Sequence, residues 1–74
     1  MPELPSLSGN QAIKVFEDIG FMVVRQRGSH VVLRRGDHGC VIPTHKQLAI
    51  GTLRSAIKQA GITVEEFTQA YKSR

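Results

Sequence analysis

The sequence predicts an α+β domain in which one helix precedes three β-strands and two helices follow them. Three observations support this order. Apolar residues recur at helical spacing near both ends, β-branched residues cluster in the middle, and glycines stand at the boundaries between segments. The 74 residues suffice for a single domain over residues 1–74, but not for a deep enclosed pocket. We therefore expect any activity to lie on an open face.

The N-terminal part predicts a short arm and then a helix. Residues 1–7 contain two prolines and are expected to be extended. A capping-box pattern begins at Ser8, and apolar residues at helical spacing follow it. Gly20 fits the left-handed position that ends a helix. The first helix is therefore expected over residues 9–19.

The middle of the chain predicts two β-hairpins. Two runs rich in β-branched residues, FMVVRQR and HVVLRR, flank the pair Gly28–Ser29. A Gly-X pair between strands favours a type II′ turn, in which the glycine takes the positive φ. A second turn, GDHG, leads to a short third strand, CVIP, and the proline is expected to end that strand or to mark an edge.

The last part of the chain predicts a loop and two helices. The segment THKQLAIG is expected to be the loop. The segment TLRSAIKQA has helical spacing and ends at Gly61. A second capping box begins at Thr63, so the last helix is expected over residues 64–72.

A two-residue turn fixes which side chains of the hairpin share a face. Arg27 then faces His30, and cross-strand partners lie on the same side. The basic, half-exposed face is expected to carry Val23, Arg25, Arg27, His30, Val32 and Arg34. The more apolar face is expected to pack on the helices through Met22, Val24, Gln26, Val31, Leu33 and Arg35. A turn longer by one residue would reverse the faces of one strand.

The charge balance favours a polyanionic partner. Ten Lys and Arg against six Asp and Glu give a net charge of +4 and a pI near 9.9. Nucleic acid fits this balance first, and an acidic protein also fits it. Cys40 is the only cysteine, so no internal disulfide is possible. We find no signal peptide and no run long enough to span a bilayer, and we expect a cytoplasmic protein without membrane partners.

His30 is the candidate catalytic residue. Arginines on its face disfavour the imidazolium, so a neutral imidazole suited to general-base catalysis is expected. The residues alone favour the other interpretation, a histidine without a role on a cationic strand. A dyad with Ser29 is not expected, because adjacent strand residues point to opposite faces.

Two further groups of residues raise the question of a binding site. His38, Cys40 and His45 lack the paired short spacings of zinc sites, so no metal is expected. The start of the helix near Thr52 offers backbone N–H groups to a phosphate, and Lys46 lies just upstream. Taken alone, that segment favours an ordinary helix start with solvated charges. Four aromatic residues fall at core spacing: Phe16, Phe21, Phe67 and Tyr71.

Five short motifs in order, spread over residues 4–67, resemble the HicA-like (YcfA-like) mRNA interferase toxins. They are Gly20–Phe21, Gly28–Ser29–His30, Pro43-x-His45, Gly51–Thr52–Leu53–Arg54 and Ala60–Gly61. The resemblance implies a fold like the double-stranded-RNA-binding domain, with helices on one face of a three-stranded antiparallel sheet. It also implies the toxin of a type II toxin–antitoxin pair, which cleaves mRNA without the ribosome and binds a HicB-like antitoxin over its active face.

By this resemblance the catalytic histidine maps to His30, and His45 becomes a candidate RNA contact. We expect His30 to take the proton of the 2′-hydroxyl, which then attacks the neighbouring phosphorus without a metal or another cofactor. A basic side chain stabilises the charge of the phosphorane. The expected RNA-contacting residues are Arg25, Arg27, Gly28, Ser29, Arg34, His45, Lys46, Thr52 and Arg54. The alternatives are a non-catalytic RNA-binding module and a protein-interaction adaptor.

Overall fold

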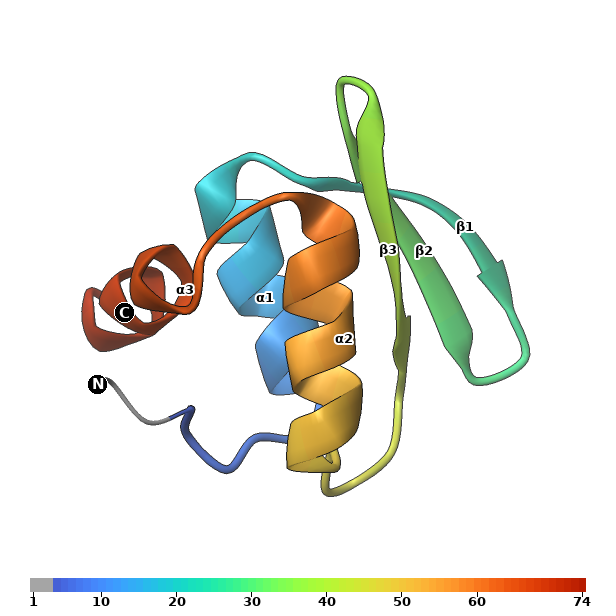
Figure 1. Cartoon of the computed structure of the whole chain (residues 1–74). Coiled ribbons are helices and arrows are strands. Elements are labelled where there is room, and N and C mark those ends of the chain that lie inside the picture. The colour runs from blue at the N-terminus through green and yellow to red at the C-terminus, as the bar shows by residue number, and fades with distance from the viewer. Residues whose placement is uncertain (1–3) are drawn as a thin grey trace.

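The computed structural model describes residues 4–74 and confirms the predicted α+β order. Its three helices lie on one side of a three-stranded antiparallel sheet, as Figure 1 shows. The predicted arm falls partly outside the described residues, and residues 4–7 are neither helix nor strand. The elements in order are α1 (Gly9–Ile19), β1 (Met22–Arg27), β2 (His30–Arg35), β3 (His38–Pro43), α2 (Ile50–Ala60) and α3 (Val64–Lys72).

The predicted helix ends are confirmed. The side chains of Ser8 and Thr63 accept hydrogen bonds from the third residues of α1 and α3, and both capping boxes are complete. Gly20 and Gly61 have φ values of 110° and 72°, and each ends its helix in the left-handed conformation. The helix α2 begins two residues earlier than predicted, because no capping side chain marks its start.

The first hairpin has the predicted turn. Gly28 has a φ of 55°, and Ser29 does not have a positive φ, as a type II′ turn requires. Arg27 pairs with His30, which confirms the predicted register next to the turn. The loop length assumed from the sequence was therefore correct.

The second hairpin has a tighter turn than predicted. Gly36 and Asp37 alone form it, with Gly36 at a φ of 60°. The strand β3 therefore begins at His38 rather than at Cys40. Pro43 ends the strand as expected.

The prediction for the faces of β1 was wrong in two respects. A β-bulge lies between Val23 and Arg25, so Val23 pairs with Leu33 and not with Arg34. Val23 thus lies on the face that was assigned to the helices. In addition, Met22 pairs with Arg34 and so lies on the outer face, and Val24 and Gln26 are exposed rather than packed.

The position of β1 in the sheet explains this exposure. The strand order is β1-β2-β3, so β1 is an edge strand. The helices pack mainly on β3, and the β1–β2 hairpin projects beyond them on the right of Figure 1. Val31 and Leu33 of β2 are buried as predicted, but a helical layer of this size does not reach across β1.

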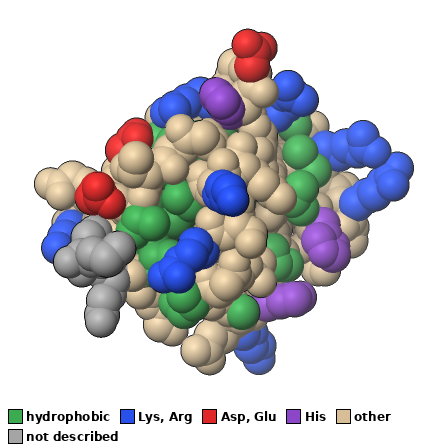
Figure 2. All heavy atoms as spheres, viewed as in Figure 1, with side chains coloured by type: hydrophobic (Ala, Val, Ile, Leu, Met, Phe, Trp, Pro, Cys, Tyr) green, Lys and Arg blue, Asp and Glu red, His purple; other side chains and the backbone are tan. Residues whose placement is uncertain are grey.

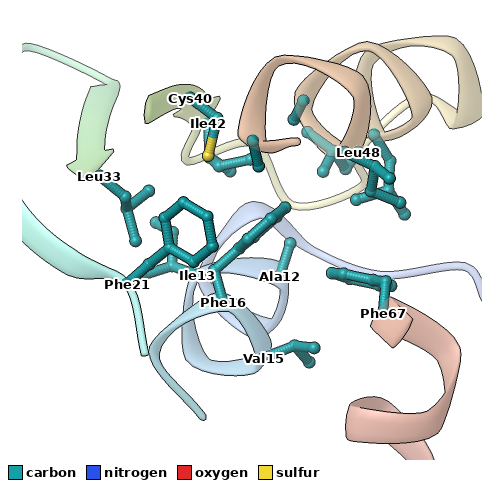
Figure 3. Close-up of a cluster of buried hydrophobic side chains, with 14 of the residues drawn as sticks. Ala12, Ile13, Val15, Phe16, Phe21, Leu33, Cys40, Ile42, Leu48 and Phe67 are labelled. Carbon is teal, nitrogen blue, oxygen red and sulfur yellow. The ribbon is translucent and has the colours of Figure 1, made fainter. Parts of the chain in front are cut away.

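Phe16 lies at the centre of the core. Its ring meets that of Phe21 edge-on, with centroids 5.3 Å apart, and that of Phe67 at 5.2 Å (Figure 3). Cys40 also lies in this cluster, as expected of a small strand residue. The prediction that Tyr71 belongs to the core was wrong, because 38% of it is exposed. Within residues 4–74, no helix has the length and apolar character needed to cross a bilayer.

Candidate nucleic-acid interface

His30 is the first residue of the central strand and is exposed. Arg27 pairs with it on β1 and Pro43 on β3, so it stands between two neighbours on the outer face of the sheet. No helix covers that face in Figure 1. The imidazole is therefore open to a large substrate such as a nucleic-acid strand.

The turn before His30 is tied to the loop between β3 and α2. The Thr44 N–H donates to the Ser29 carbonyl at 2.7 Å, and the Gly9 N–H donates to the His45 carbonyl at 2.9 Å. These two bonds hold the hairpin turn, the loop and the start of α1 at one end of the molecule. His45 and Lys46 are exposed on this loop. The structure thus brings two predicted RNA contacts to the end of the sheet that carries His30.

The first turn of α2 follows this loop. Its N-cap residue is Ala49, which offers no side-chain hydrogen bond, and no acidic residue lies in the turn. The backbone N–H groups at this helix start consequently have no capping side chain. Thr52 and Arg54 lie exposed in the first two turns. An anion at the loop would lie close to these N–H groups, which can bind it.

The arginines of the sheet lie at different distances from His30. Arg27 is its direct cross-strand partner, and Arg25 lies two residues along β1 on the same face. Arg34 also points to this face, but it lies four residues from His30, or about 13 Å along the strand. Arg34 therefore stands near the opposite end of the sheet from His30 and Arg27.

The outer part of the sheet carries positive charge without acidic side chains. The three strands contain four arginines and two histidines, of which all but Arg35 and His38 lie on the outer face. Arg35 donates to the Ile19 carbonyl, and His38 lies next to Gly61. None of the 18 strand residues is Asp or Glu. In Figure 2, the right of the view shows blue and purple side chains without red ones; other blue side chains lie at the centre, left and bottom, and red ones appear at the top and left. Such a surface attracts a polyanion.

The three candidate metal ligands do not form a group. Cys40 is buried, and burial raises the pKa of its thiol to about 11. The ring of His38 packs against Gly61 at the end of α2, whereas His45 lies on the β3–α2 loop. Nowhere in residues 4–74 do three His, Cys, Asp or Glu side chains come together in a way that could hold a metal ion.

Two supporting contacts escaped the sequence analysis. The side-chain amide of Gln26 donates to the Gly28 carbonyl at 3.0 Å and braces the turn next to His30. Gly9 is buried against Pro43 and Thr44, so only a glycine fits there. Nothing in the local sequence indicates the Gln26 contact. The close approach at Gly9 was indicated in the sequence only by a glycine directly after the N-cap of α1.

Comparison with known proteins identifies the family to which the chain belongs. No curated protein and no solved structure matches the chain. A family model described as "HicA toxin of bacterial toxin-antitoxin" matches residues 9–62, which include both hairpins, the β3–α2 loop and all of α2. This match covers more than half of the sequence, and the chain therefore belongs to the HicA toxin family of bacterial toxin–antitoxin systems.

Proposed function

We propose that this toxin is a ribosome-independent endoribonuclease that cleaves mRNA with His30 as its single catalytic histidine. The observation that carries the proposal is the exposed position of His30 on an acid-free sheet face, opposite Arg27 and at the same end as Lys46. Family membership supports the toxin role and a cognate antitoxin. We propose that this antitoxin is HicB-like and covers the outer face of the sheet.

The proposed reaction uses the RNA's own nucleophile. A neutral imidazole of His30 takes the proton of a 2′-hydroxyl, and the 2′-oxygen attacks the adjacent phosphorus. The bond from phosphorus to the 5′-oxygen then breaks, and the leaving oxygen takes a proton from water. The hydroxide left behind takes the proton held by His30, which restores water and the neutral imidazole. The products are a 2′,3′-cyclic phosphate and a 5′-hydroxyl. No step in this sequence calls on a metal ion or a cofactor.

Two groups are proposed to bind the charge that develops on the phosphate. Arg27 lies beside His30 across the hairpin, about 5.5 Å away between Cα atoms. Lys46 lies on the loop that is bonded to the Ser29 carbonyl through Thr44. A guanidinium can bind two phosphate oxygens at once, so we assign the scissile phosphate to Arg27 and the neighbouring backbone to Lys46.

Substitution of His30 tests the proposal, with His38→Ala as the matched control. Both histidines are exposed first residues of strands, but His38 packs at the far end of the sheet against Gly61. We expect His30→Ala to lower the cleavage rate by at least about 100-fold, while RNA binding persists. His38→Ala should cleave at the wild-type rate.

Substrate and chelator controls complete this test. A strand with 2′-deoxyribose at the cleavage position should resist the enzyme, and EDTA should leave the rate unchanged. Cleavage of an all-DNA strand would show that the 2′-hydroxyl is not the nucleophile. If His30→Ala cleaves like the wild type, the non-catalytic RNA-binding module becomes the better description.

A further inference from the structure

The ribonuclease proposal gives no role to the open edge of β1. β1 pairs only with β2, so its other edge has no partner strand among residues 4–74. Three consecutive apolar residues on it are exposed: Met22 at 69%, Val23 at 43% and Val24 at 55%. An exposed apolar edge strand is a site at which another chain can add a strand.

The register shows which backbone groups face this edge. In an antiparallel ladder closed by a two-residue turn, the pair next to the turn is hydrogen-bonded and the following pair is not. Arg27 and His30 form the first pair, and Gln26 and Val31 form the second. The N–H and C=O of Gln26 are therefore directed away from β2, toward the open edge.

The two faces of β1 differ in chemistry. Arg25 and Arg27 pair with Val32 and His30 and lie on the outer face. Val23 pairs with Leu33 and lies on the inner face, beyond the reach of the helices. A strand that matches both faces would alternate acidic side chains outside with apolar side chains inside.

Charge argues against a second copy of this chain as the occupant. The three strands carry no Asp or Glu, so a second β1 would bring arginines against arginines. The bulge at Val24 also breaks the regular edge, and bulges and edge charges are features that oppose self-pairing. RNA would satisfy the arginines but would leave the three apolar side chains exposed.

We propose that the open edge of β1 binds an extended segment of an acidic protein partner, which adds a fourth strand to the sheet. Its Asp or Glu side chains pair with Arg25 and Arg27, and its apolar side chains cover Val23. Such a strand would remove Arg27 from contact with phosphate. The docking site does not depend on the chemistry of cleavage.

The test uses the full chain and two short blocked peptides of opposite charge. One peptide alternates valine with glutamate, and the other alternates valine with lysine. Binding is followed by NMR through the backbone amides of residues 22–27 and their hydrogen exchange. We expect the glutamate peptide to bind at least about tenfold more tightly, to protect the Gln26 amide, and to weaken as salt is added.

Gln26→Pro and Gln26→Ala form a matched pair for this experiment. Both remove the side-chain bond to the Gly28 carbonyl, but only proline removes the N–H that faces the edge. We expect Gln26→Pro to bind the glutamate peptide about tenfold more weakly than Gln26→Ala does. Circular dichroism checks that both variants fold.

Several results would overturn the proposal. They are equal binding of the two peptides, equal binding by the two Gln26 variants, or amide changes confined to the helices. A concentration-dependent dimer of the chain alone, with its interface at β1, would assign the edge to a second copy. Protection of the Gln26 amide by a short RNA in place of the peptide would assign it to the RNA surface. The peptide titration measures no cleavage, so its failure is separate from that of the ribonuclease proposal.

Discussion

The substitution Gly9→Ala tests how the start of α1 holds the β3–α2 loop. A Cβ at Gly9 would lie 1.9 Å from the Pro43 carbonyl oxygen and 2.8 Å from the Thr44 Cα. Both are backbone atoms, so no side chain can rotate to relieve the contact. The Gly9 N–H also donates to the His45 carbonyl at 2.9 Å, and any shift weakens that bond.

The expected cost follows from these contacts. Overpacking costs about 1–3 kcal/mol and the weakened hydrogen bond about 1 kcal/mol, whereas alanine in a helix gains about 0.5–1 kcal/mol over glycine. The net loss in the free energy of unfolding is then about 1–3.5 kcal/mol. For a domain of this size that corresponds to a fall in Tm of about 4–28 °C.

Gly51→Ala is the matched control, since Gly51 lies in the first turn of α2 as Gly9 lies in that of α1. Nothing lies within 4 Å of a Cβ at Gly51, and its φ is not positive. We expect this variant to be more stable than the wild type by up to about 1 kcal/mol. Urea unfolding followed by circular dichroism measures both variants. If Gly9→Ala and Gly51→Ala unfold at the same urea concentration, the close approach at Gly9 is absent in solution.

Two other predictions concern RNA binding and the buried thiol. Arg27→Ala should reduce the slope of log affinity for single-stranded RNA against log salt by about 0.7, whereas Arg34→Ala, about 13 Å away along the sheet, should leave it unchanged; filter binding at several salt concentrations measures this. Burial raises the pKa of the Cys40 thiol from its ordinary value of 9.0 to about 11, so this group favours the folded state below pH 9. We expect the free energy of unfolding to fall by about 3 kcal/mol as the pH rises from about 9 to about 11. This loss should be missing in Cys40→Ala. Urea unfolding at several pH values measures both proteins. Rapid alkylation of folded Cys40 at pH 8 would contradict its burial.

Local signals in the sequence were sufficient for the helices and the first turn. The capping boxes at Ser8 and Thr63 and the glycine at Gly28 act through bonds and φ angles within a few residues. The same turn also placed Arg27 opposite His30 without any knowledge of the rest of the fold. Such features are predictable because their energetics do not depend on distant packing.

The faces of β1 depended on information that the local sequence does not contain. The register set by the turn predicts a more apolar face, but which strand the helices cover is decided by the whole domain. The bulge at Val24 moved Val23 to the other face, and no glycine marks it. The distance of Arg34 from His30, by contrast, followed from the sequence, because the predicted strand HVVLRR and β2 have the same bounds. Composition predicted a basic surface but not how its charges are divided between the two ends of the sheet.

The orientation of His30 is set by residues that have no part in chemistry. Val31 and Leu33 are buried on the inner face of β2, so the alternation of the strand turns His30 outward. A slip of one residue would bury the imidazole and expose Leu33 to water, and loss of the buried leucine alone costs about 2–3 kcal/mol. The hydrophobic core therefore fixes the register of β2, and the register fixes the exposure of His30. Because a small domain covers only one face of its sheet, the outer face that receives His30 stays open to solvent and to a large ligand.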